Sequence, residues 1–248
     1  ISTYLLLIIS TFIVFIRYFQ ADKEKSNEVL VACVMLGYIT ILVTNFFGFS
    51  VSSAGDVNGD GYSDVMVGAY GYSSNTGRSY IYYGGAVMNN TADVTLSEPG
   101  INKSFGYSVS KAGDFNGDGY SDVIVGVPGY STNLGRAYIY SGGSTMNTIA
   151  DGILAGFVAG TNYYGNSVSD AGDVNGDGYG DVVVGAYGMS SFQGRVFVYY
   201  GGATVNITAD LTVTGEFTGD NFATTVSSAG DTNGDGYDDI LIGASGFS

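Results

Sequence analysis

One sequence segment occurs four times in this chain of 248 residues, and this repetition restricts the fold to an array of similar units. The copies occupy residues 46–73, 104–131, 163–190 and 221–248. An aspartate-rich loop lies inside each copy, and its first aspartate falls at positions 56, 114, 173 and 231, so the period is nearly constant.

Each period predicts four short strands. Strand one precedes the aspartate-rich loop, and the others are expected at 64–69, 122–127, 181–186 and 239–244 (strand two), 78–85, 136–143 and 195–202 (strand three), and 92–96, 150–154 and 209–213 (strand four). Four-stranded units repeated radially are the blades of a β-propeller. A solenoid is the alternative, but solenoid repeats are usually shorter than about 50 residues. The sequence therefore predicts a mainly β protein with three complete blades and a partial fourth.

The repeats resemble FG-GAP repeats, which form the N-terminal β-propeller of integrin α-subunits. The resemblance covers residues 46–248 and rests on DxNGDGYxD, on the Val/Ile-Gly-Ala that ends strand two, and on Phe47-Gly48, Phe105-Gly106 and the variant Tyr164-Gly165. Departures are Val127-Pro128 in the second repeat and Phe222-Ala223 in the fourth. The resemblance implies a seven-bladed propeller, so we expect this chain to be a fragment of a larger one. Otherwise its open edges meet other subunits.

The chain divides into a hydrophobic segment, residues 1–45, and the blades 46–103, 104–162, 163–220 and a partial 221–248. Uncharged runs at 1–16 and 29–43 flank a charged stretch at 17–28, and we expect the segment to be α-helical. It predicts a membrane hairpin, or a long helix that self-associates as in type IV pilin-like filaments, although Leu5 stands where bacterial pilins have glutamate. A third reading is a signal peptide or single anchor followed by a buried helix.

Each aspartate-rich loop places oxygen-bearing side chains at positions 1, 3, 5 and 9, and the tyrosine at position 7 offers its backbone carbonyl. Such hard oxygen ligands favour Ca²⁺. The loop is not an EF-hand, because position 12 is Val or Ile within a strand. We expect about four structural Ca²⁺ ions, held by Asp56, Asn58, Asp60, Tyr62 and Asp64; Asp114, Asn116, Asp118, Tyr120 and Asp122; Asp173, Asn175, Asp177, Tyr179 and Asp181; and Asp231, Asn233, Asp235, Tyr237 and Asp239.

Composition excludes several classes of function. The chain has 8 basic and 23 acidic residues and a net charge of −15, which argues against binding nucleic acid. It has no histidine and a single cysteine, Cys33, which excludes a Ser-His-Asp triad, a His-ligated zinc site and an internal disulfide. With the carboxylates assigned to metal, we expect no enzyme.

Three smaller patterns recur between the loops. The arginine that opens strand three (Arg78, Arg136, Arg195) is expected to pair with the aspartate that opens strand four (Asp93, Asp151, Asp210). An anion site at these arginines is the alternative. The aromatic residues of strand three are expected to pack between blades, and a carbohydrate-stacking surface is the alternative (Tyr80, Tyr82, Tyr138, Tyr140, Phe197, Tyr199). Sequons at Asn89, Asn102 and Asn206 predict N-glycosylation, since the chain looks extracellular.

The resemblance implies a calcium-stabilised adhesion or binding module at the cell surface, anchored by residues 1–45. Its ligand, a protein or a glycan, would bind on the face opposite the calcium loops. It would meet the loops between strands two and three (70–77, 128–135, 187–194) and those between blades (97–104, 158–163, 215–221). The alternative is a structural subunit of an extracellular filament, with the N-terminal helix as its core and the blades outside.

Overall fold

A computed structural model describes residues 4–9, 12–17, 50–98, 103–156 and 160–246. Within these ranges the repeats form three four-stranded antiparallel sheets and a fourth sheet of two strands. Their strands are β3 (Ser50–Gly55), β4 (Asp64–Ala69), β5 (Arg78–Tyr82) and β6 (Val94–Leu96); β7 (Ser108–Gly113), β8 (Asp122–Val127), β9 (Arg136–Tyr140) and β10 (Gly152–Ala155); β11 (Val168–Gly172), β12 (Asp181–Ala186), β13 (Arg195–Tyr199) and β14 (Leu211–Thr214); and β15 (Phe222–Gly230) and β16 (Asp239–Ala244).

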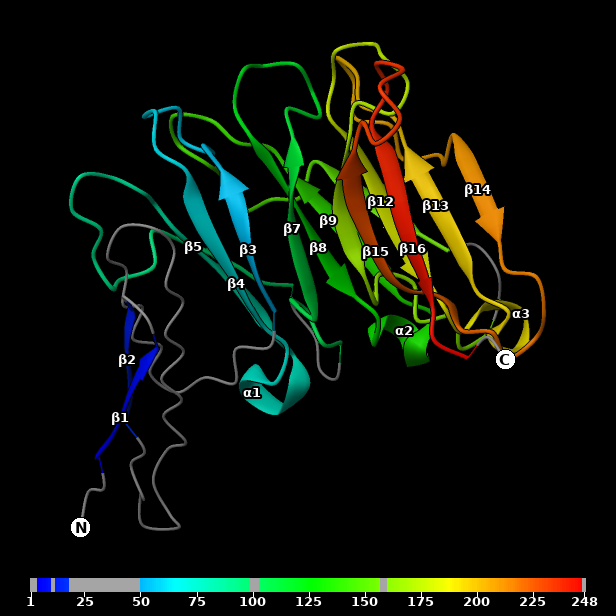
Figure 1. Ribbon diagram of the computed structural model, residues 1–248, viewed down its shortest axis with the longest axis horizontal. Coiled ribbons are helices and arrows are strands. Elements are labelled where there is room, and N and C mark those ends of the chain that lie inside the picture. Colours follow the sequence, from blue (N-terminus) through cyan, green and yellow to red (C-terminus); the bar gives the residue numbers. More distant parts are fainter. Residues whose placement is uncertain (1–3, 10–11, 18–49, 99–102, 157–159, 247–248) are drawn as a thin grey trace.

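The strands of each sheet follow one another in chain order, as in a propeller blade. Strand two of every repeat has the predicted bounds. The strands β4, β8 and β12 are buried along their whole length, which explains why they are continuous apolar runs without alternation. Neighbouring sheets meet through their first strands, β3 with β7, β7 with β11 and β11 with β15, and they lie side by side in Figure 1.

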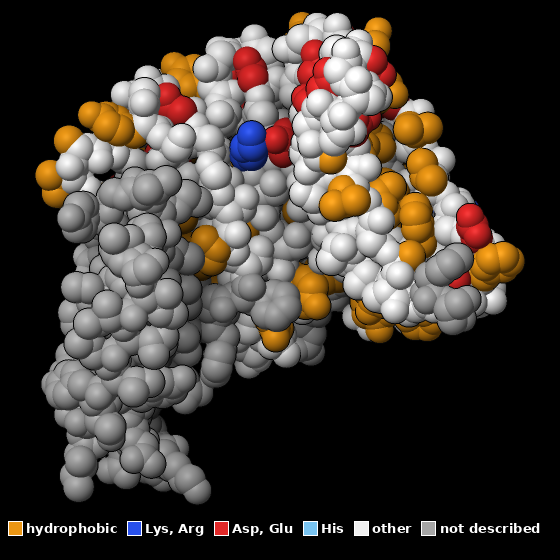
Figure 2. All heavy atoms as spheres, viewed as in Figure 1, with side chains coloured by type: hydrophobic (Ala, Val, Ile, Leu, Met, Phe, Trp, Pro, Cys, Tyr) orange, Lys and Arg blue, Asp and Glu red, His pale blue; other side chains and the backbone are white. Residues whose placement is uncertain are grey.

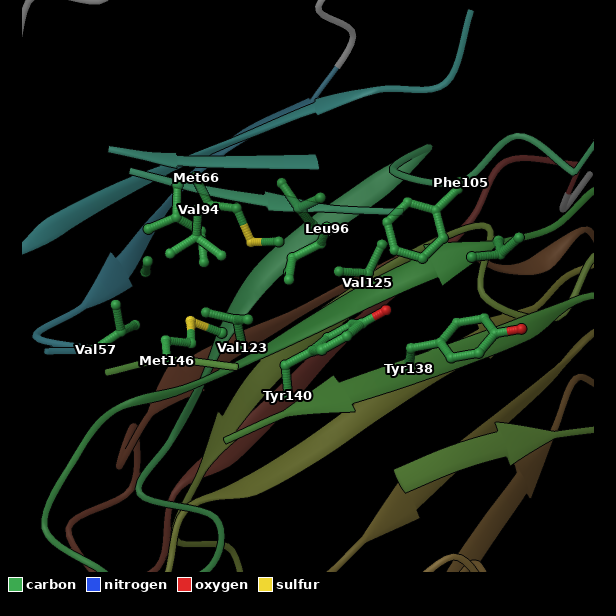
Figure 3. Packing of buried hydrophobic residues seen from close by; sticks show 14 residues of the cluster. Val57, Met66, Val94, Leu96, Phe105, Val123, Val125, Tyr138, Tyr140 and Met146 are labelled. Carbon is green, nitrogen blue, oxygen red and sulfur yellow. The ribbon is translucent and has the colours of Figure 1, made fainter. Parts of the chain in front are cut away.

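The core lies between the faces of successive sheets. Between the first and second sheets, Leu96 of β6 and Met66 of β4 belong to one cluster with Phe105, Tyr138 and Tyr140 (Figure 3). The Phe105 ring is fully buried and lies 5.8 Å from the Tyr138 ring, centroid to centroid. Tyr138 and Tyr140 of strand three therefore pack between blades, as expected, and Phe197 and Tyr199 do so between the second and third sheets. Tyr80 and Tyr82 instead belong to a cluster formed by the first repeat alone.

The glycine near the end of strand two in one repeat lies against the glycine of the Phe-Gly or Tyr-Gly pair in the next repeat. A methyl group added at Gly68 in β4 would lie 2.1 Å from the carbonyl oxygen of Gly106, and one at Gly126 in β8 would lie 2.1 Å from that of Gly165. Only glycine permits so close an approach of two backbones. In the last repeat, Ala223 stands at the position of Gly106 and Gly165. Ala223 is buried and has a φ of 67°.

Short left-handed turns follow strand two, and the sequence did not predict them. They are α1 (Tyr72–Asn75), α2 (Tyr130–Asn133) and α3 (Met189–Phe192), and each contains consecutive non-glycine residues with positive φ. The last residue of each turn accepts a hydrogen bond from the next repeat. The amides of Ser104, Tyr163 and Asn221 donate to the carbonyls of Asn75, Asn133 and Phe192 over 2.8, 2.8 and 2.9 Å. These contacts fix each sheet to its successor.

The expected Arg–Asp pairs do not form in the described residues. Strands β5 and β6 are antiparallel, with Ser79 opposite Leu96 and Ile81 opposite Val94, so the start of strand three lies beside the end of strand four. The guanidinium of Arg78 lies over the Tyr72 ring at 4.1 Å, whereas Asp93 accepts the amide of Tyr83 over 2.8 Å. Arg136 and Asp151 repeat this arrangement, with Tyr130 and the Ser141 amide as their partners.

The described part of the N-terminal segment is not helical. The strands β1 (Tyr4–Ile9) and β2 (Phe12–Arg17) form an antiparallel hairpin, where we expected a helix. Strand β2 consists mainly of Phe, Ile and Val, which favour strands, and β1 contains Tyr and two Ile beside three Leu. Periodicity cannot separate such a short apolar strand from a helix. The remaining residues of 1–45 lie outside the described ranges, so the helix there stays a prediction. No helix in the described residues is long and apolar enough to span a membrane.

Candidate metal loops

The four aspartate-rich loops join the first strand of each sheet to the second, so they lie at one edge of the array. In Figure 1 this edge is at the top, and the turns α1–α3 lie at the bottom. Acidic side chains gather along the upper edge in Figure 2. The twenty predicted ligand residues all lie in the described ranges, five in each loop.

The first aspartate organises each loop. The carboxylate of Asp56 accepts hydrogen bonds from the amides of Gly59, Asp60 and Gly61, over 2.8, 3.0 and 2.8 Å. Asp173 and Asp231 accept the three equivalent amides, and Asp114 accepts those of Asp118 and Gly119. The amide of Gly236 is the main cause of a lowered pKa at Asp231. The backbone therefore wraps around the carboxylate at position 1.

The residues at positions 3 and 5 are hydrogen-bonded to each other. The side-chain oxygen of Asn58 accepts the amide of Asp60 over 3.0 Å, and that amide also donates to Asp56 over 3.0 Å. Oxygen atoms of positions 1 and 3 thus converge on one nitrogen. The Asn58 side-chain amide donates to the Asp60 carboxylate over 2.9 Å. The second, third and fourth loops repeat the convergence on the position 5 amide.

The ninth position is the buried one. Asp64, Asp122 and Asp181 are at most 1% exposed, and each opens strand two. Asp122 accepts amides from Phe115 in its own loop, over 2.9 Å, and from Gly142 beyond strand three, over 2.8 Å. Burial raises the pKa of Asp122 to about 7 and that of Asp181 to about 6, although the backbone amides act in the opposite direction. A cation close to such a buried carboxyl group would stabilise its ionised form.

The donor set of each loop suits a hard divalent cation. It offers three carboxylates, one amide oxygen and one peptide carbonyl. The ion pairs found in the described ranges join Lys103 to Glu98 and Lys111 to Asp170, so no lysine or arginine there neutralises a loop. Among the described residues, no three acidic side chains are grouped closely enough to hold a metal ion. The carboxylates at positions 1 and 5 accept hydrogen bonds from backbone amides instead.

Neighbouring loops also contact each other, which we did not predict from the sequence. Asp56 and Ser121 exchange two hydrogen bonds: the Asp56 amide donates to the Ser121 hydroxyl over 3.2 Å, and the Ser121 amide donates to the Asp56 carbonyl over 3.0 Å. Between the third and fourth loops, the Asp173 amide donates to the carboxylate of Asp238 over 2.8 Å. Position 8 is serine, glycine or aspartate, so its side chain gave no consistent signal of these contacts in the sequence.

The sequons differ in accessibility. Asn89 is exposed, whereas Asn206 is half-buried and donates to Asp210 over 2.8 Å. Asn102 lies outside the described residues. Both described asparagines accept the amide of the sequon threonine, Thr91 over 2.6 Å and Thr208 over 2.9 Å.

Four-stranded sheets in chain order, joined through their first strands and carrying one acidic loop each, define a propeller-type repeat protein. The FG-GAP repeat family matches residues 47–82, 105–140, 165–199 and 222–248, a little over half of the chain. The chain belongs to the FG-GAP repeat family.

Similar proteins include integrin α-subunits. Integrin alpha-5 of Xenopus laevis is 28% identical over 208 residues, which cover 73% of this chain and 19% of the relative. Integrin alpha-6 of Gallus gallus is 33% identical over 185 residues (67% and 15%), and integrin alpha-2 of Bos taurus is 36% identical over 194 residues (69% and 16%). The match spans less than a fifth of each relative's length, so the likeness concerns one part of those proteins.

Proposed function

We propose that the chain is a calcium-stabilised extracellular adhesion or binding module of the integrin-like FG-GAP type, held at the cell surface. The observation that carries the proposal is the recurrence of one hydrogen-bonded loop geometry in four loops, three of them with a buried aspartate at position 9. The likeness to integrin α-subunits supports the adhesion class, and it gives no support to an enzyme.

The ion in each loop would be held by the side chains at positions 1, 3, 5 and 9 and by the carbonyl at position 7. Bound calcium would supply the positive charge that the loops lack and would join the end of strand one to the start of strand two. At a free concentration ten times the dissociation constant, each loop would add about 1.4 kcal/mol to the free energy of unfolding. The ions are therefore structural in this proposal.

The ligand face would be the opposite edge, formed by α1, α2 and α3. Arg78 and Arg136 lie there over the rings of Tyr72 and Tyr130, at 4.1 and 3.7 Å, and the serines of the turns are exposed. Such a surface of hydroxyls, aromatic rings and guanidinium groups suits a protein or a glycan ligand. Residues 1–45 would hold the module at a membrane or at other copies of itself, and the exposed Asn89 would carry a glycan.

Thermal unfolding followed by circular dichroism tests the calcium claim. The melting temperature should fall when calcium is replaced by a chelator and should return when calcium is restored. The variant Asp60→Asn, at an exposed position 5, should lose part of this calcium dependence, whereas Asp93→Asn, outside the loops, should keep all of it. A melt that is the same with and without chelator would refute structural calcium.

A further inference from the structure

The aspartate-rich loops touch one another in sequence, and the contacts involve their ligand residues. The backbone of Asp56, at position 1 of the first loop, is held through both its amide and its carbonyl by Ser121, at position 8 of the second. Ser121 lies between Tyr120 and Asp122, which occupy positions 7 and 9 of the second loop. One loop's first ligand is therefore fixed by the segment that carries the next loop's last two ligands.

A ring contact accompanies each of these backbone contacts. The Tyr120 ring covers Gly59 of the first loop, so closely that a methyl group at Gly59 would lie 2.5 Å from ring atom Cε1. Tyr179 covers Gly117 in the same way, at 2.4 Å, and Tyr237 covers Gly176, at 2.7 Å. These glycines, at position 4, have φ of 75°, which glycine adopts without strain. The tyrosine at position 7 thus packs its side chain on the preceding loop, while its carbonyl remains in its own.

The backbone contact recurs at every junction as well. The amides of Ser121, Gly180 and Asp238 donate to the carbonyls of Asp56, Asp114 and Asp173 over 3.0, 3.0 and 3.1 Å. Position 8 is Ser, Gly or Asp, so this contact does not depend on the side chain. All three junctions are therefore built alike, and the four loops form one continuous chain of contacts.

From these junctions we infer that the four loops bind calcium as a coupled array, in which an ion in one loop raises the affinity of the loop before it. The inference rests on the proposed calcium function. An ion that orders positions 7 to 9 of one loop also fixes positions 1 and 4 of its neighbour, so the neighbour loses less conformational freedom when it binds. Coupling between sites is typically about five- to 150-fold in affinity.

The test reads each loop separately by nuclear magnetic resonance. The backbone amide of the position 6 glycine, Gly61 in the first loop, reports calcium there because it donates to the position 1 aspartate. The variant Asp118→Asn weakens the second loop at an exposed position 5. It should lower the calcium affinity read at Gly61 by about fivefold or more. Asp235→Asn in the fourth loop, which does not touch the first, is the matched control and should change the Gly61 titration far less.

Removing the junction separates coupling from general damage. In a Tyr120→Ala background the carbonyl at position 7 remains, and Asp118→Asn should no longer alter the Gly61 titration. Tyr120→Phe keeps the ring and should restore the dependence. Tyr62→Ala should leave the dependence intact, since no acidic loop precedes Tyr62 in the described residues. Far-ultraviolet circular dichroism in excess calcium verifies that each variant is folded.

The outcomes are distinct. If Gly61 titrates with calcium identically in the parent and in Asp118→Asn, the coupling is refuted and the proposed calcium sites stand. If no position 6 glycine responds to calcium in the parent protein, both the coupling and the proposed function fall.

Discussion

Replacement of Gly126 by alanine should lower the free energy of unfolding, although the local backbone preference of the β8 strand alone would predict no loss. The added methyl group would lie 2.1 Å from the carbonyl oxygen of Gly165 in the next repeat. Non-bonded atoms prefer about 3.5 Å, so two backbones would have to separate by more than about 1 Å. Neither is a flexible side chain, since Gly126 lies in the buried strand β8 and the amide of Gly165 donates to the Gly185 carbonyl over 2.9 Å.

The magnitude follows from this geometry. Overpacking a core usually costs about 1–3 kcal/mol, and a clash between two fixed backbones belongs at the upper end. For a protein of this size, about 3 kcal/mol corresponds to a fall in melting temperature of roughly 6–12 °C. Alanine has the better intrinsic propensity outside positive φ, so the local effect alone would be neutral or stabilising.

Thermal and denaturant unfolding in saturating calcium would measure the change. Gly202→Ala is the matched control, because a methyl group there meets nothing within 4 Å and the residue does not have positive φ. Gly202→Ala should leave the melting temperature almost unchanged. If Gly126→Ala unfolds at the same temperature as Gly202→Ala, the close approach of the two ends of the motif does not hold the sheets together.

Further predictions concern pH, the contacts between sheets and glycosylation. In calcium-free buffer, the stability of the fold should rise as pH falls from about 7 toward 5. Burial raises the pKa of Asp122 to about 7 and that of Asp181 to about 6, above the ordinary value of 3.8, so the folded state binds protons at a higher pH than the unfolded state does. A melting temperature that falls over this range would contradict the prediction. Ser108→Ala should lower the free energy of unfolding by about 1–3 kcal/mol in urea titrations, because the Ser108 hydroxyl accepts the Val168 amide of the next sheet over 2.9 Å; a change like that of the exposed Ser74→Ala would refute this. In a eukaryotic secretory host, Asn89→Gln should remove one N-glycan by mass spectrometry. Ile149→Thr should add one, because Asn147 makes the same turn without a sequon.

Much of the fold could be predicted because the repeat fixes local and tertiary structure together. The aspartate-rich loop marks where strand two begins, and Asp64, Asp122 and Asp181 open their strands as expected. The Arg–Asp pairing was wrong because it took two residues that open adjacent strands as neighbours, although an antiparallel pair places them at opposite ends. Register, which a single strand's sequence does not contain, decided the outcome.

The left-handed turns escaped prediction for a different reason. Ser73, Ser74 and Asn75 adopt positive φ although none is glycine, and local preference disfavours this conformation. The compensation comes from the next repeat, where the Ser104 amide donates to the carbonyl of Asn75. The contacts between loops were missed similarly, because a tyrosine that packs on a glycine of the preceding repeat, as Tyr120 does on Gly59, leaves no trace in the local pattern.

The hydrogen bonds that join the turns α1, α2 and α3 to the following repeats affect how the chain folds during synthesis and how it can evolve. During synthesis, the turn of one repeat acquires its hydrogen-bond donor only when the following repeat has left the ribosome, so assembly should advance with a lag of one period. Over evolutionary time, duplication or loss of a whole period preserves every donor and acceptor, whereas a half-period change leaves an acceptor without its donor. Repeat number can therefore vary among descendants, while the distance along the chain from one turn to its donor is held.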